Sequence, residues 1–215
     1  MTLNAEIEQR LSKELGGDET ARTLAAILLE ETLSWEPPVI AVERITTVLA
    51  FTFGNRMLPN GNREPGPVNT ALADIAAVLH RRTGARVFAQ WEVAAALRDR
   101  VPSDLLTAIY PGRDVRDEPV YLGTTGTLEE IARLAEPRLL GCVGVVAFAD
   151  HVYRCVATAR RLGFDAYAPA ELAMPTTYDA ASGQAWCRER IAYLLHDIMI
   201  RITERRAAVV GAMWR

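Results

Sequence analysis

His151 and Arg154 form the most chemically suggestive pair in a chain of 215 residues that has only three histidines. Both follow the apolar run "GCVGVVAFA", and Asp150 lies between that run and His151, where an aspartate favours the N-cap of a helix. Residues three apart share one edge of a helix. A helix N-terminus disfavours a protonated imidazole, so we expect a neutral His151 that can exchange a proton with a ligand. The alternative is an ordinary surface histidine beside a helix cap.

Two further stretches carry groups suited to catalysis or binding. Glu92 follows the run "ARVFAQ" and is a candidate general base or ligand-binding carboxylate, or a first-turn glutamate that only favours the helix dipole. The segment "GNRMLPNGNREPGP" follows the run "ITTVLAFTF" and is long for a strand-to-helix connection, as functional loops often are. Gly54 would let the backbone approach a ligand closely, and Asn55 and Arg56 are candidate ligand-binding residues because they lie nearest the strand end. A plain solvent loop fits the same pattern.

The stretch "GTTGTLEEI" predicts a helix N-terminus. Thr127 and Glu130 fit the Thr-x-x-Glu capping box. Thr124, Thr125 and Gly126 would then form a rim of backbone N–H groups, where either an anion or water can bind.

The elements that must position these residues alternate along the chain. Apolar runs predict five strands, over residues 45–53, 85–90, 119–123, 141–149 and 164–169. Helical patterns lie between them, including a turn or two in "PSDLLTAIYPG", and a long closing helix over residues 186–206 is expected to bury Ile191, Leu195 and Ile198. Strands that alternate with helices pair in parallel through right-handed crossovers.

We therefore predict an α/β, Rossmann-like three-layer fold with a mostly parallel five-stranded sheet and an N-terminal helical extension. The extension would span residues 1–36 and the α/β domain residues 37–215. Because ligands of such sheets bind outside the carboxyl ends of the strands, the candidate residues are expected to lie along one edge.

Composition excludes several classes of function. A net charge of −3 without a basic cluster argues against a nucleic-acid partner. No apolar run reaches the roughly 20 residues that span a bilayer, and the polar N-terminus favours a cytoplasmic protein. Lys13 is the only lysine, so a lysine Schiff base is not expected. The cysteines and histidines lack metal-ligand spacing, and no metal site is predicted. Ester hydrolysis ranks last because the chain has no G-x-S-x-G.

The order of these features resembles the YdcF-like family, which includes SanA- and ElyC-type proteins. The resemblance covers residues 45–169 and rests on Gly54, Glu92, "TTGTLEEI", the His-x-x-Arg pair of His151 and Arg154, and "AYAP". The chain departs from the family at "AQWE" and at Asn69-Thr70. The resemblance implies a Rossmann-like fold and, since some relatives are thought to bind S-adenosylmethionine, makes that compound a candidate cofactor.

The expected function is binding of a small anionic or nucleotide-like metabolite at the carboxyl ends of the strands. His151 and Glu92 are the predicted acid–base residues. The predicted ligand-binding residues are Gly54, Asn55, Arg56, Thr124, Thr125, Gly126, Thr127 and Arg154. An enzyme of this kind would be a metal-independent transferase, hydrolase or lyase. The alternative is a non-catalytic regulatory or interaction module that acts through its N-terminal helices, with a homodimer as one arrangement.

Overall fold

The structure is a computed structural model that describes residues 2–112 and 122–212. Contacts among the described residues divide the chain into two compact units, one drawn from Met1–Glu36 and Leu194–Arg215, the other from Pro37–Tyr193. The predicted boundary after residue 36 coincides with this division. The residues after 193, which sequence reasoning assigned to the α/β domain, instead group with the N-terminal helices.

The helical unit contains α1 (Leu3–Leu15), α2 (Asp18–Leu28), a π-helical turn (Leu29–Leu33) and the greater part of α7 (Arg190–Ala212). Gly16 ends α1 in the left-handed region, with φ 69°, a conformation that glycine adopts without steric cost. Among the described residues, no helix is long and apolar enough to cross a membrane.

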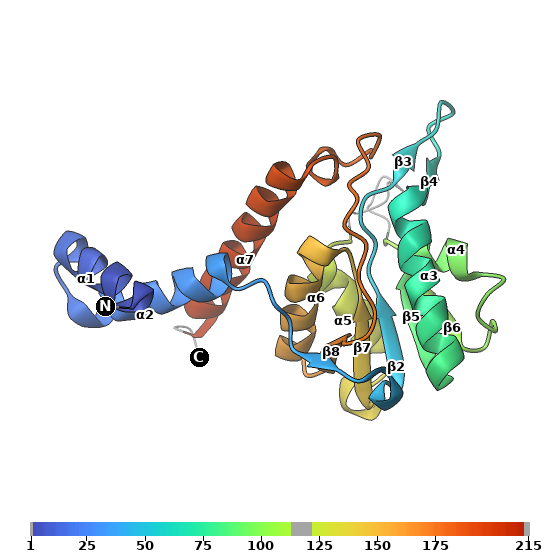
Figure 1. Ribbon diagram of the computed structural model, residues 1–215, viewed down its shortest axis with the longest axis horizontal. Helices are drawn as coiled ribbons and strands as arrows, with labels where there is room; N and C mark the ends of the chain where they lie inside the picture. The colour runs from blue at the N-terminus through green and yellow to red at the C-terminus, as the bar shows by residue number, and fades with distance from the viewer. Residues whose placement is uncertain (1, 113–121, 213–215) are drawn as a thin grey trace. The chain divides into compact units, whose positions relative to one another are not determined.

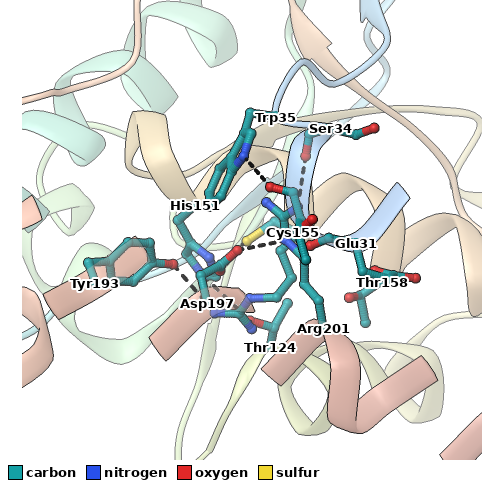
Figure 2. A network of polar contacts seen from close by, with 12 residues as sticks. Glu31, Ser34, Trp35, Thr124, His151, Cys155, Thr158, Tyr193, Asp197 and Arg201 are labelled. Atoms are coloured by element: carbon teal, nitrogen blue, oxygen red, sulfur yellow. Dashed lines mark hydrogen bonds and ion pairs between the residues drawn. The ribbon is translucent and has the colours of Figure 1, made fainter. Parts of the chain in front are cut away.

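Arg201 links α7 to the N-terminal helical segment of this unit. It is 2% exposed and donates from Nε to Asp197 Oδ2 at 2.7 Å. Its Nη1 donates to the backbone carbonyls of Glu31 and Ser34, at 3.2 and 2.7 Å, and its guanidinium lies 4.1 Å from the centre of the Trp35 ring (Figure 2). The last carbonyls of a helix lack partners within the helix, so Arg201 satisfies the end of the N-terminal helical segment.

The α/β unit is built on a parallel sheet. Its six strands are β1 (Val39–Ile40), β2 (Thr47–Ala50), β5 (Arg86–Gln90), β6 (Leu106–Ile109), β7 (Cys142–Val146) and β8 (Asp165–Pro169). They lie in the order β1-β8-β7-β2-β5-β6, and every neighbouring pair is parallel. The predicted α/β class with a mostly parallel sheet is confirmed, with six strands in place of five.

The strand predictions differ from the structure at the sheet edges. The segment predicted as a helical turn forms β6, because its backbone completes the hydrogen bonds of β5 at the register Val87↔Leu106. The predicted strand 119–123 lies mostly outside the described residues, and Leu122 and Gly123 are not in a strand. The two-residue strand β1 was not predicted. The predicted loop contains a short hairpin of β3 (Arg56–Met57) and β4 (Arg63–Glu64).

Helices cover both faces of the sheet (Figure 1). α3 (Gly66–Thr83) and α4 (Trp91–Leu97) pack on one face, and α5 (Thr124–Leu134) and α6 (Ala149–Arg161) on the other. Successive residues of a strand point to opposite faces. Accordingly Val48 and Ala50 of β2 pack with α3 and α4, while Leu49 and Phe51 pack with α5 and α6. Continuously apolar strands follow from this double coverage.

The strand order defines where a ligand of this fold would bind. From β2 the chain proceeds through β5 to β6 on one side, then returns to β7 and β8 on the other side of β2. The order therefore reverses between β2 and β7. In open α/β sheets, ligands bind at such a switch point, outside the carboxyl ends of the strands. The segments at this point are residues 51–55 and 147–151.

Candidate functional site

Glu92 is a buried carboxyl beside the switch point. It is the second residue of α4, directly after β5, and is 4% exposed. Asn55 Nδ2 donates to its Oε1 at 3.4 Å, whereas its Oε2 has no hydrogen-bond partner among the described residues. Burial raises the pKa of Glu92 to about 7, since desolvation disfavours the charged form. Both protonation states of Glu92 are therefore populated near neutral pH.

Asn69 and Gln90 fix the loop that carries Gly54 and Asn55. The buried Asn69 amide accepts from the Phe53 N–H and the Thr52 hydroxyl, both at 2.8 Å, and donates to the carbonyl of Gly54 at 2.8 Å. Gln90 accepts from the Thr52 N–H at 2.9 Å. These four hydrogen bonds join the segment after β2 to α3 and β5, so the position of Asn55 beside Glu92 is set by buried amides.

The space beside Gly54 is occupied by the protein's own chain. Gly54 has φ 70°, and a Cβ there would lie 2.4 Å from Ser182 Oγ. The Gly183 N–H donates to the Asn55 carbonyl at 2.6 Å. Gly54 is thus a point of close approach, and the approaching group is the segment between β8 and α7. The close approach of a ligand to Gly54 stays a prediction.

A second buried polar group lies at the start of α5 and α6. Arg154 Nη1 donates to the Thr124 hydroxyl at 2.9 Å, and its Nη2 contacts the Tyr193 hydroxyl at 3.4 Å. His151 Nε2 lies 3.5 Å from Thr124 Oγ1 and 3.1 Å from Cys155 Sγ (Figure 2). The structure therefore brings His151, Arg154 and Thr124 together, as the sequence predicted, and adds a thiol to the imidazole.

Both helix starts differ from the predictions. α5 begins at Thr124 after an extended Gly123, so Thr127 lies inside the helix and its hydroxyl donates to the Gly123 carbonyl at 2.9 Å; the capping box is wrong. α6 begins at Ala149 with Phe148 as N-cap, so the predicted N-cap role of Asp150 is also wrong.

The Asp150 carboxylate instead accepts from the Tyr178 hydroxyl at 2.8 Å and pairs with Arg190 at 3.0 and 3.1 Å. Both partners lie later in the chain. Burial, followed by the hydrogen bond to Asp150, raises the pKa of Tyr178, so Tyr178 remains a neutral donor.

The remaining predicted ligand residues have structural partners or lie at the rim. Arg56 forms a two-pronged ion pair with Asp179, at 2.8 and 3.0 Å. Thr127 is 1% exposed, and a Cβ on Gly126 would lie 2.9 Å from Cδ1 of Leu122, in the segment just before α5. Thr125 is half-buried in the first turn of α5.

Aromatic rings fill the switch point between the two polar groups. Phe53, after β2, stacks on Phe148, after β7, with ring centres 4.0 Å apart. Tyr178 packs edge-on against Phe148 at 4.6 Å, and Tyr193 lies 4.7 Å from Phe53. Flat apolar faces flanked by polar groups are the usual lining of small-molecule sites.

No group of three or more His, Cys, Asp or Glu side chains within residues 2–112 and 122–212 is arranged to hold a metal ion. A shallow cleft in the helical unit lies against α1 and the start of α2, lined by Ala5, Glu8, Gln9, Ser12, Lys13 and Asp18. None of the candidate residues lines it.

Comparison of the chain with protein-family models, curated proteins and solved structures finds no match. The resemblance to the YdcF-like family, the ligand and the homodimer therefore stay predictions, and so does an interaction role for the N-terminal helices.

Sequence reasoning missed several residues that shape this region. Asn69 was noted only as a departure from the family pattern. Tyr178, Ser182 and Gly183 lie in a polar stretch without periodicity. The contacts of Ser182 and Gly183 with Gly54 and Asn55 join positions more than a hundred residues apart. Gln90 could have been recognised from the sequence, since it is a polar residue at the end of an apolar strand.

Proposed function

We propose that the α/β unit binds a small anionic or nucleotide-like metabolite at the carboxyl ends of β2, β5 and β7. The observation that carries this proposal is the buried Glu92 carboxyl, whose Oε2 has no partner among the described residues. An unsatisfied buried oxygen costs free energy, and a ligand hydroxyl or amine would remove that cost.

The place of Glu92 in the fold favours a ligand that contains a ribose. Glu92 follows the second strand of the β2-α3-β5 unit. In dinucleotide-binding folds a carboxylate at the equivalent place binds a ribose hydroxyl. The connection between β2 and α3 lacks the G-x-G-x-x-G fingerprint that binds a pyrophosphate, so a dinucleotide is a poorer candidate than a compact nucleoside. S-adenosylmethionine, the compound implied by the family resemblance, has such a ribose and also a carboxylate.

The second polar group supplies the complementary charge. Arg154 is a cation that is 6% exposed, and it lies beside the Thr124 hydroxyl at the N-terminus of α5. Guanidinium groups and helix N-termini both favour anions. In this proposal Arg154 and Thr124 bind the anionic end of the metabolite, His151 orients Thr124, and Glu92 exchanges a proton with the ligand.

Calorimetric titration with S-adenosylmethionine, ATP and glucose 6-phosphate tests the proposal. At least one probe is expected to bind, and Glu92→Gln is expected to weaken that binding about tenfold at pH 8, since a charged acceptor is lost. The loss should be smaller near pH 6, where Glu92 itself is largely neutral. Glu136→Gln, at an exposed glutamate, is the matched control. Failure of all three probes, or equal affinities of the two variants, contradicts the proposal.

A further inference from the structure

Residues 170–189 connect β8 to α7 and lie against the carboxyl edge of the sheet, and we call them the strap. The strap contains only one short 3-10 turn (Ala185–Cys187) and is the orange-to-red coil in Figure 1. The internal hydrogen bonds of the strap form short turns between residues 179 and 188. Contacts with other elements must therefore fix the strap against the sheet.

These contacts occupy the groups that a switch-point ligand would use. The strap's Pro175 carbonyl accepts from the Ala149 N–H, the first of α6, at 2.9 Å. First-turn N–H groups are the usual donors to an anion at this place. The Gly183 N–H of the strap donates a hydrogen bond to the Asn55 carbonyl. Ser182 Oγ fills the space beside Gly54, 2.4 Å from where a Cβ on that glycine would lie.

One ion pair fastens the middle of the strap. Asp179 pairs with Arg56 of β3, and their side chains are 11% and 39% exposed. The Arg56 guanidinium lowers the pKa of Asp179, so this contact persists over the neutral range. Cys187 belongs to the 3-10 turn of the strap, is 3% exposed, and has its Cβ 3.3 Å from the Cβ position of Gly54.

We propose that the strap is an autoinhibitory cover of the ligand edge, with Arg56–Asp179 as its latch. The strap takes the place of a ligand at the Ala149 N–H and beside Gly54, and it must leave before a ligand can reach Glu92. The inhibition of ligand binding rests on the proposed function, whereas the opening of the strap can be measured independently of any ligand.

The rate of N-ethylmaleimide labelling of each cysteine, followed by peptide mass spectrometry, measures the opening. Asp179→Asn is expected to raise the labelling rate of Cys187 about tenfold, the effect of losing one charged hydrogen-bonded pair. Cys155, also fully buried but within α6, should keep its rate and so reports any global destabilisation. Arg56→Gln should reproduce the result. Asp74→Asn, which breaks the exposed pair with Arg100, should change neither rate.

An unchanged Cys187 rate in Asp179→Asn overturns the proposal, and so does an equal rise at Cys155 and Cys187. Faster Cys187 labelling without binding of any probe would support the autoinhibitory strap and contradict only the proposed metabolite binding. Probe binding with unchanged Cys187 labelling would contradict the autoinhibitory strap and support the proposed metabolite binding.

Discussion

Replacement of Glu92 by glutamine is expected to flatten the pH dependence of stability of the α/β unit. The pKa of Glu92 rises from 4.5 to about 7 on folding because the carboxyl is buried. A raised folded pKa means that the folded state binds the proton more tightly than the unfolded state. The stabilisation by Glu92 is therefore complete below pH 4.5 and is lost as the pH rises through 7. The shift corresponds to about 3 kcal/mol.

Urea denaturation of both proteins between pH 4.5 and pH 8 measures this effect. The difference in free energy of unfolding between Glu92→Gln and the wild type should move by about 3 kcal/mol in favour of the variant across that range. Glu129→Gln, at an exposed glutamate of α5, should follow the wild-type curve. Parallel curves for wild type and Glu92→Gln would show that Glu92 titrates alike in both states, and would remove its acid–base role.

Replacement of Arg201 by methionine is expected to destabilise the helical unit by about 3–5 kcal/mol, the cost of breaking a buried ion pair from one side. Asp197 is 0% exposed and would lose the guanidinium at 2.7 Å. Arg201 also satisfies the carbonyls of Glu31 and Ser34. These losses add to that of the Trp35 contact.

Arg205→Met is the matched control, one turn further along α7. Arg205 pairs with Glu30 at 3.7 Å, and both side chains are substantially exposed, so its loss should cost less than about 1 kcal/mol. Hydrogen exchange read by mass spectrometry localises the effect. Peptides from α2 and the second half of α7 should lose protection in Arg201→Met, while β2 and β5 keep theirs. Similar exchange in the two variants would contradict the assigned role of Arg201.

The central strands β2, β5, β7 and β8 and the helices between them could be predicted because they depend on local patterns. Short apolar runs separated by helical periodicity indicate a doubly covered parallel sheet, and the candidate residues were chosen as those that follow the strands. That choice placed Glu92 beside Asn55, and His151 beside Thr124 and Arg154, all buried at one edge.

The first residue of each helix and the buried face of α7 were harder to predict from the sequence. The extended Gly123 and Phe148 begin helices without a capping side chain, so the side-chain signals at Thr127 and Asp150 were misleading. The face of α7 was predicted from its apolar residues. Ile191 and Leu195 are 60% and 59% exposed, since an ion pair occupies the buried positions Asp197 and Arg201. A buried ion pair on one face of a helix replaces the apolar residues by which that face would be recognised.

The strap could not have been predicted for a related reason. Its contacts from Tyr178 to Asp150, and from Asp179 to Arg56, are made by polar residues of a segment that has no secondary-structure signal. A polar loop after the last strand gives no indication of whether it projects into water or covers the sheet edge. Only the packed structure shows that Ser182 and Gly183 lie against Gly54 and Asn55.

The most direct test of the ligand site is backbone amide NMR of the wild type and Asp179→Asn during titration with S-adenosylmethionine. We expect the largest chemical-shift changes at Gly54, Asn55, Glu92, Thr124 and His151. Binding to Asp179→Asn should be tighter than to the wild type, because the strap opens more readily in the variant. The largest changes within residues 2–36 or 194–212, or no changes in either protein, would contradict the proposed site.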